Sequence, residues 1–165
     1  MGRLTSEAHK LSGMNLIAKM SPVILYVEDE EGDRLLMRMG FERGRLEASL
    51  RTVDDGRLAV EYLTGAGIYA NRETHPLPAL VLLDLNLPEI HGFDVLKWIR
   101  AHPFHSALPV VVFTSSKREE DRAKAKLLGA SDFVLKPNTP KAFQDVARML
   151  SERWLNGDGG KTGAE

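Results

Sequence analysis

Five short runs of consecutive apolar residues divide the chain, and polar residues follow each run. A run of this kind predicts a strand buried on both faces, as in a parallel sheet. The stretches between the runs, and the stretch after the last one, carry apolar residues at helical spacing. Because parallel neighbours need crossover connections, this alternation predicts an α/β fold with a doubly wound five-stranded parallel sheet and five helices. The predicted strands span residues 23–27, 48–53, 80–83, 109–113 and 131–135.

Helical spacing also predicts which face of each helix packs on the sheet. The first helix is expected to fade near residues 40–44, and Trp98 is expected to lie half exposed beside the apolar stripe of the third. The last helix is predicted to begin at a Thr139 cap, with Pro140 in its first turn. The expected buried positions, helix by helix, are Leu35, Leu36 and Met39; residues 58–63; Val95, Leu96 and Ile99; Ala123, Leu127 and Leu128; and Phe143, Val146, Ala147, Leu150 and Trp154.

A chain of 165 residues is long enough for one globular domain with a substantial core, and too short for two of ordinary size. We expect this domain to span residues 21–155, after an N-terminal arm over residues 1–20 and before a flexible Gly-rich tail over residues 156–165. The arm has scattered apolar residues that could form a helix packed on this or another subunit. It could equally be floppy, or an artefact of an early start codon, because Met14 and Met20 are alternative starts.

Composition excludes several classes of protein. The 22 basic and 23 acidic side chains give a formal net charge of -1, which argues against a nucleic-acid partner. Cysteine is absent, which excludes disulfides and thiolate metal sites and suits a reducing compartment. No stretch has the length and apolar character of a membrane span or of a secretory leader. We therefore expect a cytoplasmic protein with no membrane partner.

Polar side chains follow four of the predicted strands: Glu28 and Asp29 the first, Asp84 the third, Thr114 the fourth and Lys136 the fifth. The carboxyl ends of parallel strands meet at one edge of such a sheet, so these side chains are expected to share one crevice. Clustered carboxylates repel one another unless a cation compensates them, and oxygen ligands suit Mg²⁺. A carboxylate beside Mg²⁺ and an ammonium group can also act as a nucleophile toward phosphorus. The pattern therefore indicates that Asp84 is a phosphoacceptor.

Other interpretations of these residues remain open. Residues 28–33 could form an ordinary solvated acidic loop, and Thr114 and Lys136 could be an ordinary helix cap and strand exit. A phosphatase of the haloacid dehalogenase class also uses a strand-end Asp with Mg²⁺, but it needs a second Asp two residues later as general acid, where this chain has Asn86. A flavodoxin-like binding module would place flavin phosphate after the first strand, where the acidic loop would repel it. His102 and His105 are interpreted as a surface loop and not a metal site.

The motifs together resemble the receiver domain of two-component response regulators, across about residues 22–155. The resemblance implies a flavodoxin-like sheet in the order 2-1-3-4-5 and commonly a cis bond between Lys136 and Pro137. The sequence departs mildly from the family pattern at two positions. This chain has Glu28 where the family usually has Asp, and Ser115 where the family often has Ala. The carrying residues are Val27-Glu28-Asp29, Asp84-Leu85-Asn86-Leu87-Pro88 with Gly92, Thr114-Ser115, and Phe133 three residues before Lys136-Pro137.

The same resemblance assigns a role to each of these positions. Asp29, Asp84 and the Asn86 carbonyl would bind Mg²⁺ or Mn²⁺ directly, and Glu28 would bind it through water. Thr114, Lys136 and the Ser115 amide would hold the phosphoryl oxygens, and Thr114 and Phe133 would change position on switching. The residues given a structural role are Pro88, Gly92 and Pro137.

A narrower resemblance is to the single-domain regulators paired with bacterial phytochrome histidine kinases. It rests on residues 82–88, on Tyr69-Ala70-Asn71 in the preceding loop and on Arg153-Trp154-Leu155 at the end. It implies a signalling protein, not an enzyme, that takes its phosphoryl group from a sensor histidine kinase and forms a homodimer through the last helices and possibly the N-terminal arm. The alternatives are a phosphorelay intermediate or the receiver of a non-phytochrome kinase.

Overall fold

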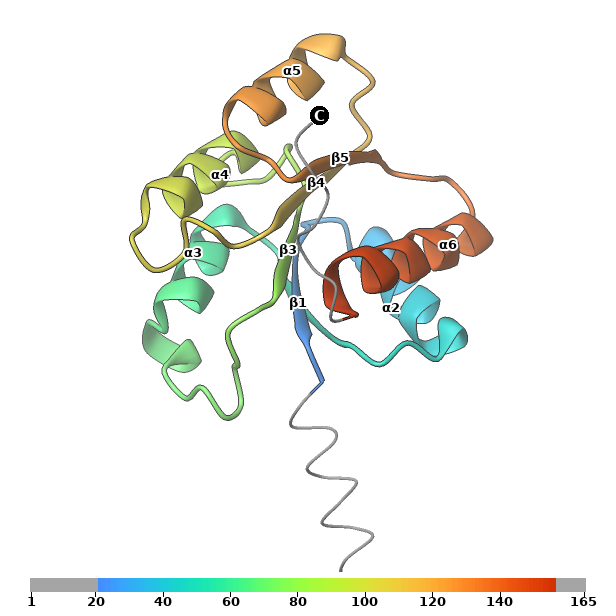
Figure 1. The fold of residues 1–165 in the computed structure, drawn as a ribbon, viewed down its shortest axis with the longest axis horizontal. Coiled ribbons are helices and arrows are strands. Elements are labelled where there is room, and N and C mark those ends of the chain that lie inside the picture. Colours follow the sequence, from blue (N-terminus) through green and yellow to red (C-terminus); the bar gives the residue numbers. More distant parts are fainter. Residues whose placement is uncertain (1–20, 157–165) are drawn as a thin grey trace, which may run out of the picture.

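The computed structural model describes residues 21–156 and contains one parallel sheet of five strands (Figure 1). Its strand order is β2-β1-β3-β4-β5, which confirms the expected doubly wound topology. The strands are β1 (Val23–Val27), β2 (Ser49–Val53), β3 (Leu80–Leu83), β4 (Val110–Thr114) and β5 (Asp132–Leu135). In the register, Val27 lies beside both Val53 and Leu83, so the carboxyl ends of the three neighbouring strands are level.

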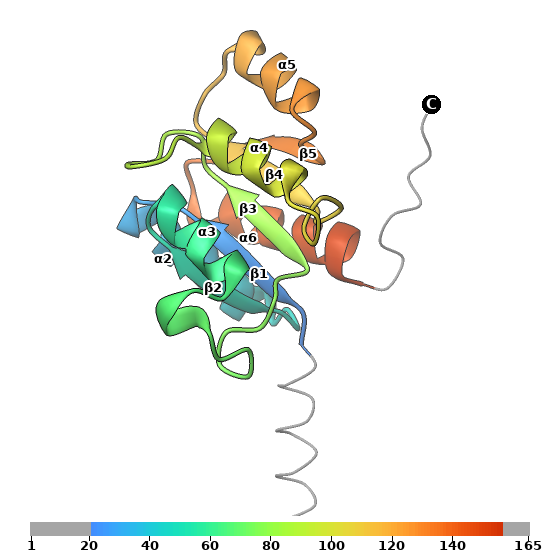
Figure 2. The ribbon, with the colours of Figure 1, turned by 90° about the vertical axis from the view of Figure 1, so that its left-hand side faces the viewer.

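Five helices cover the two faces of the sheet, as expected (Figure 2). The helices α2 (Glu31–Gly44) and α6 (Pro140–Leu150) lie together on one face. The other face is covered by α3 (Gly56–Thr64), α4 (Gly92–Ala101) and α5 (Glu119–Leu127). A short 3-10 turn (Gly67–Tyr69) precedes β3, and a wider π-type turn (Ser151–Leu155) continues α6.

The core lies on both faces of the three central strands, because successive strand residues point to opposite sides. Leu25 and Val27 of β1 pack toward α3 and α4, whereas Ile24 and Tyr26 pack toward α2 and α6. Leu82 joins the second of these two clusters. Burial on both faces explains why these strands read as uninterrupted apolar runs.

The predicted face of α2 is wrong at Leu35, whereas Leu36 and Met39 are partly buried as part of it. Leu35 is 51% exposed, and the buried positions are Met37, Gly40 and Phe41. A β-carbon at Gly40 would lie 3.1 Å from the Cα atom of Gln144 in α6, so this glycine marks a close approach of the two helices and not the end of α2. The helix continues to Gly44 because its buried face follows the contact with α6.

The predicted face of α5 is also wrong, except for Leu128, which is partly buried. Ala123 is exposed, Leu127 is 85% exposed, and the buried residue of the helix is Ala125. Cationic side chains take the place of apolar ones at this contact. The Arg122 guanidinium lies 4.7 Å from the centre of the Phe133 ring, and the Lys124 ammonium lies 4.7 Å from that of the Phe93 ring.

The remaining helices follow their predictions. Val95, Leu96 and Ile99 of α4 are buried and Trp98 is partly exposed. In α6 the Thr139 side chain caps the helix by accepting a hydrogen bond from the amide of Ala142. The residues of its predicted face are buried or partly buried: Phe143, Val146, Ala147, Leu150 and, in the turn after α6, Trp154.

The long connection between α3 and β3 is held by Arg72. Its guanidinium donates to the carbonyls of Tyr62 at 2.7 Å, Leu63 at 2.8 Å and His75 at 3.2 Å. These bonds fasten the connection to the last turn of α3. The arm over residues 1–20 and the tail from residue 157 lie outside the described residues. Within residues 21–156, no helix is both long and apolar enough to cross a membrane.

Candidate functional site

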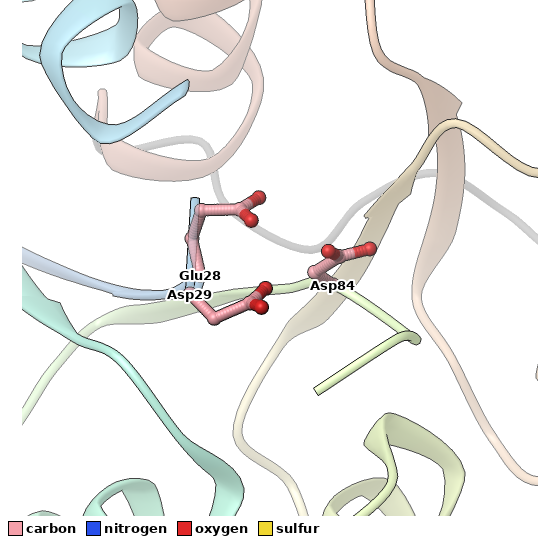
Figure 3. A group of neighbouring side chains, drawn as sticks. All are labelled: Glu28, Asp29 and Asp84. Atoms are coloured by element: carbon pink, nitrogen blue, oxygen red, sulfur yellow. The ribbon is translucent and has the colours of Figure 1, made fainter. Parts of the chain in front are cut away.

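Three carboxylates meet at the carboxyl edge of the sheet (Figure 3). Glu28 and Asp29 directly follow β1, and Asp84 directly follows β3. One oxygen from each group lies within 4.8 Å of the others, and the side chains of Glu28 and Asp29 extend toward Asp84. Glu28 and Asp84 are buried, whereas Asp29 is exposed and leaves the cluster open to water on its side.

These carboxylates form an acidic group able to bind a divalent metal. Hard cations such as Mg²⁺ and Mn²⁺ prefer oxygen ligands, and Mg²⁺ usually keeps several waters beside one or two carboxylates. The open side at Asp29 leaves room for such waters. Neighbouring carboxylates repel each other by roughly 4 kcal/mol at 4 Å and an effective dielectric near 20, so a bound cation would relieve the repulsion.

Lys136 is the cationic partner of the cluster. Its ammonium lies 2.5 Å from Glu28 Oε2, 3.1 Å from Asp84 Oδ2 and 2.9 Å from Asp33 Oδ2. Asp33 belongs to the first turn of α2 and was not among the residues predicted for the site. The sequence shows Asp33 only as one charge in the acidic run 28–33. Its part in the site comes from the long-range contact with Lys136, which the sequence does not show.

Burial changes the acid–base properties of this cluster. Removal of Glu28 from water raises its pKa to about 7, and the Asp84 charge adds to the rise while the Lys136 hydrogen bond opposes it. Burial disfavours the charge of Lys136, but Glu28, Asp84 and Asp33 outweigh this effect and raise its pKa. With three carboxylates around it, Lys136 stays charged, and Glu28 is the member of the pair that titrates near neutral pH.

Glu28 is fixed by donors on both of its oxygens. Oε1 accepts from the amide of Glu30 at 3.1 Å, and Oε2 accepts from the Tyr26 hydroxyl at 3.0 Å as well as from Lys136. Tyr26 was also not among the predicted site residues. It lies within a strand read as wholly apolar, where its ring counts as core and its hydroxyl gives no signal.

The Asp84 carboxylate accepts hydrogen bonds from its own loop and from the residue that follows β5. Its Oδ1 atom accepts from the amide of Leu85 at 2.8 Å and its Oδ2 atom accepts from Lys136. Gly92 lets this loop fold back, since a β-carbon there would lie 2.2 Å from the carbonyl oxygen of Asp84. The turn between them also uses Pro88, whose carbonyl accepts from the amide of Ile90 at 2.8 Å.

Thr114 closes the site at the end of β4. It is buried, its Oγ1 atom accepts from the amide of Ser116 at 3.2 Å, and its carbonyl accepts from the amide of Lys136 at 2.9 Å. Ser115 beside it is exposed. No peptide bond in residues 21–156 is cis, so the Lys136–Pro137 bond is trans, unlike the form that the family resemblance implies.

Two further predicted residues, Asn86 and Phe133, have other contacts in the structure. Asn86 lines a cavity of about 270 Å³ together with His91 and Ser116. Phe133 is partly buried on β5 beneath Arg122. Their proposed parts in metal binding and switching stay predictions.

Comparisons with known proteins agree with this geometry. Residues 24–148 match the family model of the response regulator receiver domain. The response regulator Rcp1 of Synechocystis sp. is 33% identical over 133 residues, which cover 81% of this chain and 88% of Rcp1. The crystal structure of the Mn²⁺-bound form of Rcp1 aligns with a TM-score of 0.72 and 32% identity, over 82% of this chain and 96% of that one. The phosphorylated cyanobacterial phytochrome response regulator RcpA aligns with a TM-score of 0.75 and 32% identity, over 82% of this chain and 94% of that one.

The fold and site are those of a phosphoacceptor signalling module rather than an enzyme in the ordinary sense. The chain belongs to the response regulator receiver domain family. Its relatives include phytochrome response regulators, and receiver domains partner with sensor histidine kinases.

Proposed function

We propose that this chain is a single-domain response regulator that accepts a phosphoryl group on Asp84 from a sensor histidine kinase and signals through protein contacts in the cytoplasm. The observation that carries the proposal is the placement of Asp84 at a strand end, within 3.1 Å of Lys136 and beside two further carboxylates. In the transfer, an Asp84 oxygen forms a bond to phosphorus while the bond from phosphorus to the kinase imidazole breaks.

The residues around Asp84 would have two roles in this transfer: some would bind the phosphoryl oxygens and others would bind the metal. Lys136 would move from the carboxylates to a phosphoryl oxygen, and Thr114 and the Ser115 amide would hold the others. Glu28, Asp29, Asp84 and the Asn86 carbonyl would hold Mg²⁺ or Mn²⁺, which when bound neutralises charge on the transferring group.

We further propose that the kinase is a bacteriophytochrome and that the chain forms a homodimer through its last helices. The first part is supported by the likeness to Rcp1 and RcpA. For the second, the described chain offers the turn after α6, where the buried indole nitrogen of Trp154 has no hydrogen-bond partner within residues 21–156. Thr114 and Phe133 would transmit phosphorylation to the surface of α5, β5 and α6.

The first test is the intact mass after incubation with acetyl phosphate, with and without Mg²⁺. We expect a single phosphoryl increment that requires both Mg²⁺ and Asp84 and that disappears in Asp84→Asn. Asp54→Asn is the matched control, because Asp54 also follows a strand at the same edge but lies outside the acidic cluster. An increment that persists in Asp84→Asn would refute the assignment of the acceptor.

The partner and the assembly need separate tests. Phosphoryl transfer from a purified bacteriophytochrome should exceed transfer from a histidine kinase of another sensor class. Equal transfer from both would favour a general phosphorelay role. Light scattering over a range of concentrations should show a dimer, and a monodisperse monomer at high concentration would remove that part of the proposal.

A further inference from the structure

Tyr26 is a core residue with a polar end inside the acidic cluster. Its side chain is completely buried, and its ring lies 5.9 Å from the ring of Phe113, which itself packs edge-on against Phe143. These aromatic neighbours fix the ring between the sheet and the helices α2 and α6. The position of the Tyr26 hydroxyl, 3.0 Å from Glu28 Oε2, is therefore set by the core and not by the site.

The two donors to Glu28 Oε2, Tyr26 and Lys136, differ in their other contacts with the site. Lys136 is shared with Asp33 and Asp84, and the proposed function requires it to turn toward a phosphoryl oxygen. When it turns, Glu28 loses one of the two donors on Oε2. The Tyr26 hydroxyl remains on that oxygen, because the ring that carries it cannot move with Lys136.

We propose that Tyr26 is a positioning residue for the divalent-metal site, which keeps the Glu28 carboxylate oriented toward Asp29 and Asp84 both in the unphosphorylated chain and when Lys136 moves to the phosphoryl group. The proposal rests on the proposed function and extends it to a residue that touches neither the metal nor the phosphoryl group. Partners that orient a ligand in this way typically change metal affinity by about 10- to 100-fold when they are removed.

The direct test is the affinity for Mn²⁺, measured from the electron paramagnetic resonance signal of the free ion. Glu28 is expected to bind through water, so Tyr26→Phe should weaken Mn²⁺ binding by about tenfold, the lower end of that range. Tyr62→Phe is the matched control. Tyr62 is also buried, and its hydroxyl donates to the carbonyl of Pro76 at 2.9 Å, away from the site, so its variant should bind Mn²⁺ like the native chain.

Phosphorylation by acetyl phosphate gives a second measurement. Tyr26→Phe should need about ten times more Mg²⁺ for half of its maximal rate and should reach the native rate at saturating Mg²⁺. A role confined to core stability would lower the amount of folded protein and leave the half-saturating concentration of Mg²⁺ unchanged. Tyr26→Leu, which also removes the hydroxyl and keeps an apolar core, should shift that concentration in the same direction.

A double-mutant cycle shows whether Tyr26 acts through Glu28. In a Glu28→Ala background, Tyr26→Phe should produce no further loss of Mn²⁺ affinity. Native affinity in Tyr26→Phe, an equal loss in Tyr62→Phe, or a full additional loss in the Glu28→Ala background would each overturn the proposal. A native chain that binds Mn²⁺ but takes no phosphoryl group would instead refute the proposed function, while the Mn²⁺ titrations would still decide the role of Tyr26.

Discussion

The buried Glu28 carboxyl should make the stability of the metal-free protein depend on pH. Its pKa is raised from an ordinary value of 4.5 to about 7, chiefly because burial disfavours its charge. Between these two values the folded protein holds a proton that the unfolded chain has released. Raising the pH through this window therefore removes a proton from the folded state alone, and the free energy of unfolding falls.

The size of this effect follows from the shift. One pKa unit corresponds to about 1.4 kcal/mol, so Glu28 should lower the free energy of unfolding by about 2 kcal/mol between pH 5.5 and pH 7.5. The raised pKa of Lys136 keeps that side chain charged throughout the window and adds no slope there. Glu28→Gln removes the titrating group while keeping its shape and one of its two acceptor oxygens, and it should remove the same 2 kcal/mol of pH dependence, since the lost acceptor costs the same at every pH in the window.

The assay is urea denaturation of both chains in EDTA at a series of pH values. The difference in free energy of unfolding between native and Glu28→Gln cancels the histidines and other groups that titrate in both. We expect this difference to change by about 2 kcal/mol across the window, with Glu28→Gln the more stable chain, relative to native, at the alkaline end. Parallel curves for the two chains would refute the reasoning, because they would mean that Glu28 ionises at an ordinary pH in the folded state.

Three further predictions test other parts of the structure. Gly92→Ala should destabilise the protein by about 3 kcal/mol in urea denaturation and slow phosphorylation, because the new β-carbon would meet the carbonyl of Asp84. The control is Gly32→Ala, which has nothing within 4 Å and should stabilise α2 by about 0.5 kcal/mol. Equal effects of the two substitutions would contradict the close approach at Gly92. Arg72→Ala should lower the free energy of unfolding by about 2 kcal/mol and speed proteolysis of the connection before β3 while leaving phosphorylation intact, and unchanged proteolysis would argue against its role. A double-mutant cycle between Arg122→Ala and Phe133→Leu should give a coupling of roughly 0.5 to 1 kcal/mol in urea denaturation, and zero coupling would exclude the cation–π contact as a fastening of α5.

The sheet could be predicted from the sequence because its central strands are buried on both faces. A run such as Leu80–Leu83, ended by Asp84, suits a strand buried on both faces and is too short for a buried helix. The faces of α2 and α5 could not be predicted in the same way. Gly40 packs closely because it has no side chain, and Arg122 packs on an aromatic ring despite its charge, so neither contributes to an apolar stripe.

The acidic cluster could be predicted because its members directly follow strands, and a parallel sheet brings those ends together. Asp33 and Tyr26 were missed for two different reasons. Asp33 is one of several acidic residues in a row, and only its contact with Lys136, about a hundred residues later in the sequence, places it in the site. Tyr26 lies inside a strand, where sequence shows the apolar ring and not the direction of the hydroxyl.

The pairing of α2 with α6 has a consequence for how the chain folds during synthesis. β1 is among the first described elements to leave the ribosome, yet its neighbour β3 is synthesised more than fifty residues later. Gln144, which Gly40 of α2 contacts closely, is separated from that glycine by an even longer stretch of sequence. Such contacts between distant residues slow folding and leave apolar surface exposed in the meantime. A nascent chain that ends before α6 would leave Phe41 and the neighbouring face of the sheet exposed to water. The domain can therefore complete its core only when nearly all of it has been translated.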